Sequence, residues 1–191
     1  DCYNETYTDC VDCNRTLIIE DDEVYTIEED DEYPRCYGCH RQAQNGQTVH
    51  DYGYKPRPIF HYNRDIETIN RNTLTFGLEL EVENRNGESG DYEGYEGSQS
   101  MAQRVKDEYS DCEDILYLKE DSSLNNGFEI VTHPFTWAYW KETLSQHFQE
   151  LTSMLRSNNF RSYSTDSCGM HIHINKHAFA NVHLYKFIQL I

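Results

Sequence analysis

Acidic and imidazole side chains on three short strand-like segments constrain this chain most: residues 75–83, 127–132 and 168–175. Side chains alternate across a strand, so each segment sorts into two faces. In the first segment, four apolar residues oppose three carboxylates: Phe76, Leu78, Leu80 and Val82 against Glu79, Glu81 and Glu83. In the third, three apolar residues oppose two imidazoles and an amide: Met170, Ile172 and Ile174 against His171, His173 and Asn175. We predict that these strands lie side by side in a core sheet with one polar face.

Length and charge limit the classes of protein to consider. The 191 residues allow one medium domain with a small appendage. A formal charge of −18 repels phosphate backbones, so we expect no nucleic-acid partner, whereas divalent cations or a basic protein are favoured. No apolar run is long enough for a membrane span. The chain starts without a methionine and stops inside an apolar helical pattern, so we expect a piece of a longer protein.

Four of the seven cysteines form two tight pairs, Cys10-x-x-Cys13 and Cys36-x-x-Cys39. Disulfide frameworks rarely repeat this spacing, whereas four thiolates around a tetrahedral zinc ion do. The sequence therefore predicts a structural zinc that folds a module too small for its own core, in a reducing, cytoplasmic setting. Disulfide pairing remains an alternative, as does replacement of one cysteine by His40 or Cys2.

Three regions follow from the composition: a zinc-ribbon-like module (1–45), an extended connector (46–72) and a main domain (73–191). We expect a hairpin of residues 16–19 and 23–27 between the cysteine pairs, and the connector could pack across the main domain. There, residues 84–100 read as a loop. Helices are predicted at 100–109, 136–157 and from Asn181, with strands at 115–118, 128–132, 160–164 and 170–175. This mixture favours an α+β fold. Cys112 and Cys168 are expected to be buried small residues.

The polar face of the predicted sheet has the composition of a divalent-metal site. Mg²⁺ and Mn²⁺ prefer hard oxygen ligands, and a mixed set of glutamates and histidines suits them better than a structural zinc. Glu129 lies between Phe128 and Ile130, where a carboxylate without a partner would be costly to bury. A solvated sheet face is the alternative, and a metal-dependent hydrolase using His171 and His173 is a further one.

Four motifs in this order resemble the amidoligases, phage and bacterial proteins among the glutamine synthetase-like carboxylate–amine ligases. The resemblance covers about residues 73–191 and rests on Gly77-x-Glu79-x-Glu81, Lys119-x-Asp121-x-Ser123-Leu124, Gly127-Phe128-Glu129-Ile130-Val131-Thr132-x-Pro134 and Cys168-Gly169-Met170-His171-Ile172-His173. The paired zinc knuckles followed by Tyr54-Lys55-Pro56-x-Pro58-x-Phe60 are similar to an arrangement in phage members.

The resemblance implies an antiparallel sheet curved into a half-barrel, with ATP and divalent ions on its concave face. The family reaction activates a small-molecule or peptide carboxylate as an acyl phosphate, which an amine attacks to form an amide. Arginines that neutralise the transferring phosphate in the family are expected beyond Ile191, because Arg156, Arg161 and Lys176 do not match them.

The resemblance also implies roles for individual residues. Glu79, Glu81 and His171 match magnesium or manganese ligands, and Glu81 also serves cofactor binding. Glu129 matches a metal or amine-side ligand with a catalytic role, and Asp121, in the family's acidic turn, is expected to be catalytic as well. His173 matches a contact to the nucleotide phosphate.

A different class of function stays open from the sequence. An acidic phage-type protein could keep this fold without catalysis and bind a host protein through its zinc module. Stabilisation by Mg-ATP would distinguish an enzyme from such a binder.

Overall fold

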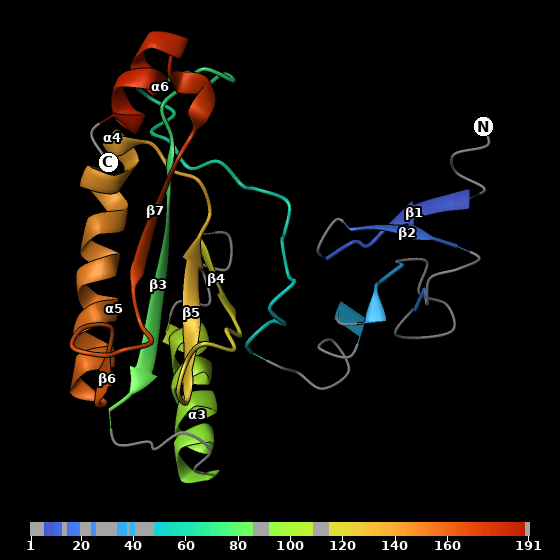
Figure 1. The fold of residues 1–191 in the computed structure, drawn as a ribbon, viewed down its shortest axis with the longest axis vertical. Coiled ribbons are helices and arrows are strands. Elements are labelled where there is room, and N and C mark those ends of the chain that lie inside the picture. Colours follow the sequence, from blue (N-terminus) through green and yellow to red (C-terminus); the bar gives the residue numbers. More distant parts are fainter. Residues whose placement is uncertain are drawn as a thin grey trace.

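The computed structural model describes residues 6–12, 15–19, 24–25, 34–37, 39–40, 48–85, 92–108 and 115–189. Within these residues the chain is an α+β protein, as predicted, with antiparallel strands and a few helices (Figure 1). The strands are β1 (Tyr7–Asp9), β2 (Thr16–Ile18), β3 (Phe76–Asn84), β4 (Leu116–Lys119), β5 (Gly127–Thr132), β6 (Phe160–Arg161) and β7 (Met170–Ile174). The helices are α3 (Tyr92–Glu108), α4 (Trp137–Tyr139), η2 (Trp140–Leu144), α5 (Ser145–Ser157), η3 (Lys176–Ala178) and α6 (Asn181–Ile188).

The main sheet has β3 at its centre. The strand order is β4-β5-β3-β6, and β7 also pairs with β3, so the three strands that were predicted to be neighbours are neighbours. All pairings are antiparallel, with Glu81 opposite Glu129 and Glu79 opposite His171. Directly opposed residues of an antiparallel pair share one face. This register therefore gathers the acidic and imidazole side chains on a single face.

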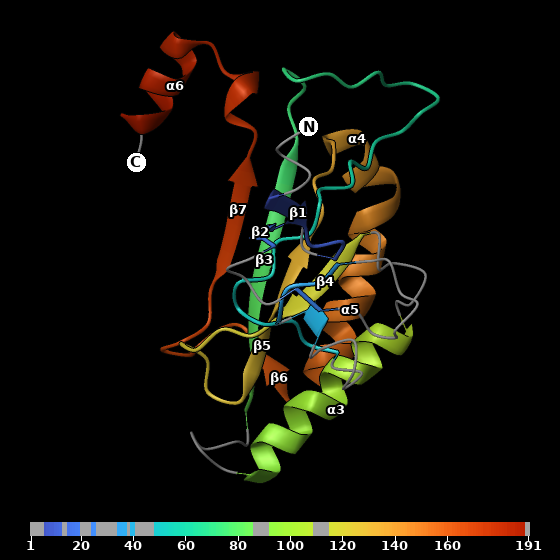
Figure 2. The same ribbon diagram turned by 90° about the vertical axis from the view of Figure 1, so that its right-hand side faces the viewer.

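The other face of the sheet carries the hydrophobic core. Helices α3 and α5 cover that face (Figures 1 and 2). The side chains of Phe128 and Ile130 are at most 1% exposed and pack with Val82, Val105 and Leu151. Burying each such side chain contributes about 1.5–3 kcal/mol. The alternation in β3 and β5 therefore fixes which face is packed and which is left open.

A continuous helical segment runs from Trp137 to Ser157 and confirms the prediction for residues 136–157. Thr136 caps its start, because its hydroxyl accepts a hydrogen bond from the Tyr139 N–H. The middle part, η2, is a short π-helical stretch. The apolar stripe of the whole segment packs on the sheet through Leu144, Phe148, Leu151 and Leu155.

Helix α3 begins at Tyr92, eight residues earlier than predicted, so the loop expected over residues 84–100 is partly helical. Glycines at 94 and 97 lower helix propensity, which explains the sequence-based assignment. A Cβ at Gly97 would lie 2.9 Å from the Asn84 side-chain nitrogen, so this glycine permits close approach to β3. Packing of Ser98, Met101 and Val105 against the sheet outweighs propensity here.

The N-terminal module contains a different hairpin from the predicted one. Strand β2 pairs with β1, and Tyr25 bridges to Arg35. The prediction that residues 16–19 pair with residues 23–27 is therefore wrong for the described residues. Cys10 directly follows β1, and its N–H donates to the Arg15 carbonyl at 2.8 Å, next to the pairing of Asp9 with Thr16. This bond continues the β1–β2 pairing by one step.

The connector packs against the main domain. The His50 N–H donates to the Leu118 carbonyl, and the Glu120 N–H donates to the His50 carbonyl. Further along, the His61 N–H donates to the Pro134 carbonyl at 2.8 Å. These bonds attach the connector beside β4 and the end of β5, and it passes over the open face of the sheet (Figure 2, teal).

Strand β7 differs from the prediction in its environment. Ile172 lies opposite Leu78 on the helix-covered face, yet Ile172 is 57% and Met170 56% exposed. Apolar residues of α6 are exposed as well, including Tyr185 and Ile188. Among the described helices, none combines the length and apolar character that a bilayer crossing requires.

Candidate functional site

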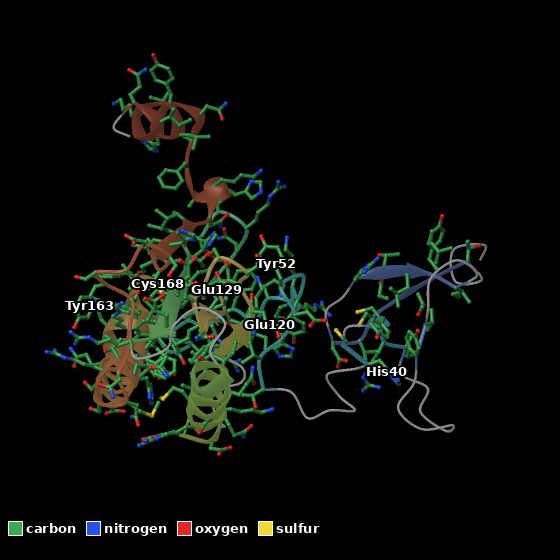
Figure 3. The ribbon with its side chains drawn as sticks, turned by 60° about the horizontal axis from the view of Figure 1, so that its bottom comes forward. His40, Tyr52, Glu120, Glu129, Tyr163 and Cys168 are labelled. Carbon is green, nitrogen blue, oxygen red and sulfur yellow. The ribbon has the colours of Figure 1, made fainter. Side chains whose placement is uncertain are left out.

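The open face of the sheet bears a recess of about 550 Å³ beneath the connector. Strands β3, β4, β5 and β7 and the turn after β4 supply its polar lining, namely Glu79, Glu81, Lys119, Asp121, Glu129 and His171. Tyr52, Gly53 and Lys55 of the connector close one side. Figure 3 shows Tyr52 and Glu129 where the connector meets the sheet, with His40 apart in the N-terminal module.

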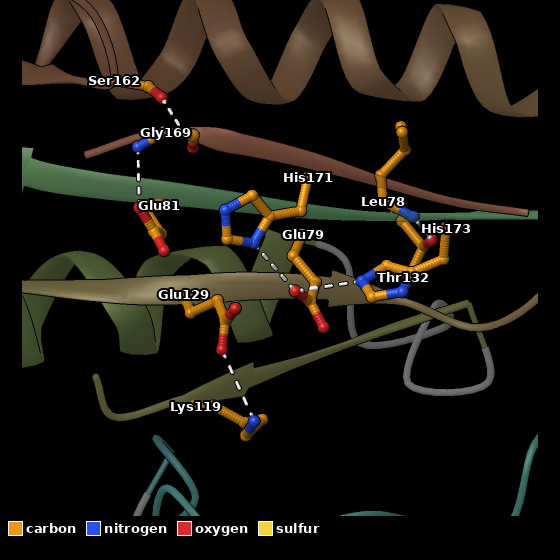
Figure 4. A network of polar contacts seen from close by, with 10 residues as sticks. All are labelled: Leu78, Glu79, Glu81, Lys119, Glu129, Thr132, Ser162, Gly169, His171 and His173. Carbon is orange, nitrogen blue, oxygen red and sulfur yellow. Dashed lines mark hydrogen bonds and ion pairs between the residues drawn. The ribbon is translucent and has the colours of Figure 1, made fainter. Parts of the chain in front are cut away.

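Two histidines hold Glu79. One carboxylate oxygen, Oε2, lies 3.2 Å from His171 Nδ1 and 3.0 Å from His173 Nε2 (Figure 4). Burial acts to raise the pKa of Glu79, but the hydrogen bonds and charge of the histidines outweigh it, so the pKa lies below its ordinary value. Glu79 is therefore kept as a carboxylate anion, the form that binds a cation.

Glu81, Asp121 and Glu129 form a compact oxygen cluster. One ligand oxygen from each lies within 4.8 Å of the others. Oxygens that share one divalent ion at about 2.1–2.6 Å lie no more than about 4.2–5.2 Å apart, so the cluster fits Mg²⁺ or Mn²⁺. Glu81 is fixed by the Gly169 N–H at 2.7 Å. The Ser123 N–H donates to Asp121 at 2.7 Å and is the main cause of the lowered pKa of Asp121.

Glu129 is buried and has a basic neighbour. Burial raises the pKa of Glu129, and the ammonium of Lys119, 3.5 Å from Glu129 Oε2, partly opposes this effect (Figure 4). The Tyr52 ring lies 5.3 Å from the same ammonium. Next to them, burial and the charges of Glu79 and Glu129 raise the pKa of Tyr117 to about 12, so this phenol stays protonated.

A second pocket of about 700 Å³ adjoins the recess at Glu79, which lines both. Its walls are mainly apolar and aromatic, with Phe60 from the connector, Phe76 and Val131. Arg71 and Asn175 add polar groups. The site thus has an acidic compartment and an apolar compartment, with Glu79 at their boundary and His173 beside it on the apolar side.

The far end of the open face serves a structural purpose. Glu83 accepts hydrogen bonds from Arg161 at 3.2 Å and from the Ser167 hydroxyl at 2.6 Å. Cys168 is half-buried, less than predicted, and burial raises the pKa of its thiol. A protonated thiol is a poor nucleophile. Cys112 lies outside the described residues.

The N-terminal module gathers three of the four predicted zinc ligands. Sulfur atoms of Cys10, Cys36 and Cys39 lie within 4.8 Å of one another and are buried. Thiolates on a tetrahedral zinc ion are about 3.8 Å apart, so this group fits zinc. Cys13 and the alternative ligand Cys2 lie outside the described residues, whereas His40 stacks on Tyr25 with ring centroids 4.7 Å apart.

The recess unites Glu79, Glu81, Asp121, Glu129 and His171, while His173 lines the apolar pocket and reaches the recess only through its contact with Glu79. Sequence reasoning missed Lys119, Tyr117 and Tyr52 as parts of the site. The alternation in residues 116–119 places Tyr117 and Lys119 on one face of their strand. Only the pairing of Lys119 with Glu129 shows that this is the acidic face.

Comparison with known proteins identifies the family of this chain. A family model described as "Putative amidoligase enzyme" matches residues 23–191, a range that also includes the connector and Cys36-x-x-Cys39 and so begins well before residue 73. No curated protein and no solved structure matches the chain. Because the family model covers most of the sequence, the chain belongs to the amidoligase family.

Proposed function

We propose that this chain carries the ATP- and metal-dependent site of a carboxylate–amine ligase that acts through an acyl phosphate. Membership of the family supports ligase chemistry. The observation that carries the proposal is the recess itself, where the cluster of Glu81, Asp121 and Glu129 lies beside the histidine-held Glu79. We also propose the curved sheet of glutamine synthetase-like enzymes and a zinc-ribbon-like N-terminal module.

The chain's own residues divide into two metal-binding groups. Glu81, Asp121 and Glu129 would hold one Mg²⁺ or Mn²⁺ ion, and Glu79 with His171 would hold another. Divalent cations at these positions would neutralise phosphate charge and orient the transferring group. Gly169 and Ser123 keep two of the carboxylates in place through backbone N–H groups.

The apolar compartment suits the nucleoside of ATP. Aromatic and proline side chains such as Phe60, Phe76 and Pro58 offer flat surfaces for a base, and Asn175 and Arg71 offer hydrogen bonds. His173 lies between this compartment and the carboxylates, where its ring N–H would donate to a phosphate oxygen. The phosphates would then extend from the apolar compartment toward the acidic one.

The acidic compartment suits the amine. The Lys119 ammonium already lies 3.5 Å from Glu129, so this carboxylate accommodates an ammonium group. In the proposed reaction the substrate carboxylate oxygen attacks the terminal phosphorus of ATP, and ADP leaves. Glu129 binds the substrate ammonium and accepts one of its protons; the free amine then attacks the acyl carbon, phosphate leaves, and the amide nitrogen gives up its second proton to solvent.

ATP turnover with carboxylate and amine substrates tests the proposal, with the full protein and Mg²⁺. Glu79→Ala and His171→Ala should each lower turnover at least about 100-fold, since charge stabilisation of phosphoryl transfer depends on positioned ligands. Glu150→Ala removes a carboxylate on helix α5, on the opposite face of the sheet, and should leave turnover unchanged. Equal turnover in Glu79→Ala and wild type would refute the site assignment.

A second function has separate support in the N-terminal module. Large apolar side chains are exposed there, namely Tyr7, Val11, Ile19 and Tyr37. We infer that this surface docks a protein, either a host protein or a peptide substrate of the ligase. Mg-ATP should raise the unfolding temperature of an enzyme and leave that of a non-catalytic binder unchanged.

A further inference from the structure

Lys119 is a nearly buried cation in a recess built from carboxylates. Its side chain is 11% exposed, and that of its partner Glu129 is 6% exposed. Strand β4 directs Lys119 to the same face as Glu129, because the two residues lie directly opposite each other. Glu79, Glu81 and Asp121 line the same recess. The ammonium therefore occupies a place where a metal ion would also be attracted.

The pairing has a clear role in the absence of metal. A buried carboxylate that loses its partner strongly destabilises a protein, so Lys119 keeps Glu129 in the recess. A divalent ion bound by Glu129 would remove the need for this partner. It would also repel the ammonium, since two positive charges would then lie within a few ångströms of each other.

We propose that Lys119 is an exchangeable counter-ion: it positions Glu129 in the metal-free protein, and a divalent cation displaces it. This inference rests on the proposed function, because it takes Glu129 as a metal ligand. The released group keeps a neighbour that it already has in the metal-free structure. Tyr52 lies beside the ammonium at the mouth of the recess, and an aromatic face attracts a cation. From there the flexible side chain reaches an anionic group of the substrate.

Acylation of lysine amines tests the displacement in the wild-type protein. A hydroxysuccinimide ester labels exposed amines, and peptide mass spectrometry measures the rate at each lysine. Saturating Mn²⁺ should raise the labelling rate of Lys119 severalfold. Lys141 is exposed on η2, outside the recess, and serves as the internal control, with an unchanged rate.

Two matched variants give a second readout. Lys119→Met should bind Mn²⁺ about tenfold more tightly than wild type, because a nearby positive charge is removed. Electron paramagnetic resonance of Mn²⁺ measures this binding. The same variant should unfold at a lower temperature without metal, since Glu129 loses its partner. If Lys119 had only a structural role, its replacement would lower both the Mn²⁺ affinity and the unfolding temperature. A higher Mn²⁺ affinity together with a lower unfolding temperature therefore indicates the exchangeable counter-ion. Lys141→Met, at an exposed position on η2 on the helix-covered side of the sheet, should change neither property appreciably, because solvent screens exposed charges.

The outcomes separate this inference from the proposed function. If Mn²⁺ does not bind to the wild-type protein at all, the metal site is refuted and the exchange with it. If Mn²⁺ binds but Lys119 labelling stays constant, only the exchange is refuted. Should Lys119→Met fail to fold, the labelling of the wild-type protein still decides the question.

Discussion

Replacement of Gly127 by alanine tests the packing that holds the site together. Gly127 opens β5 and pairs with Glu83 of β3. An ideal Cβ at this position would lie 2.0 Å from the Val82 carbonyl oxygen and 3.0 Å from the Glu83 Cα. Both neighbours are backbone atoms, so no side chain can turn away. To restore an ordinary contact, the start of β5 must move by more than about 1 Å in a close-packed sheet.

Such a movement has a predictable energetic consequence. Forcing extra atoms into a packed interior costs about 1–3 kcal/mol, and loss of ladder hydrogen bonds at this end adds to it, so we expect Gly127→Ala to lose about 3–5 kcal/mol. Glu129 lies two residues further along β5, and the movement should also weaken Mn²⁺ binding. Urea denaturation measures the first effect and metal titration the second.

Gly77→Ala provides the matched control in the same sheet. A Cβ there would lie 3.7 Å from the His173 Cβ and 3.9 Å from the Thr132 carbonyl oxygen, which are ordinary contacts. This variant should lie within about 1 kcal/mol of wild type. Equal urea midpoints for Gly127→Ala and Gly77→Ala would show that the close approach of β5 to β3 does not exist.

Three further changes follow from individual contacts. Burial, and secondarily the charge of Lys106, lower the pKa of His50 from 6.5 to about 4. The neutral imidazole is thus favoured in the fold: its contribution is complete above pH 6.5 and is lost toward pH 4, up to about 3 kcal/mol. Denaturation at several pH values should show this loss in wild type and much less in His50→Gln. Cys36→Ser should abolish the zinc content of the purified protein, and retained stoichiometric zinc would contradict the thiolate site. The buried Thr132 hydroxyl accepts from the Leu78 N–H at 2.8 Å, so Thr132→Val should cost about 1–3 kcal/mol in urea denaturation. An unchanged midpoint would show that this bond is dispensable.

The strands of the main sheet were readable from the sequence because local chemistry determines them. Alternation in residues 76–83 places Leu78 and Leu80 toward the helices and Glu79 and Glu81 toward the open face, and the structure has this arrangement. Helix positions 136–157 were equally clear, since the apolar spacing matches one helical face. In both cases the residues that decide the structure lie within one element.

Elements whose structure depends on distant contacts were predicted less well. The start of α3 was missed because Gly97 lowers helix propensity, while its benefit, close contact with Asn84, is visible only in three dimensions. The first hairpin was assigned to the wrong partner strand. Both candidate segments have strand-like residues, and the pairing of β2 with β1, continued by the Cys10–Arg15 hydrogen bond, decides between them.

The candidate site depends both on local sequence patterns and on contacts between distant residues. The carboxylates and imidazoles of the candidate site were proposed from the motifs, but the position of Lys119 beside Glu129 depends on the register between β4 and β5. A shift of one residue would turn Lys119 toward the helices and leave Glu129 without this partner. Buried charges without partners are expensive, so the ion pair itself helps to specify the register. Lys119, which acts on the electrostatics of the recess, thus also helps to fix its strand in place. For this reason Lys119→Met should perturb strand pairing more than Lys141→Met, and amide hydrogen exchange in β4 would reveal the difference.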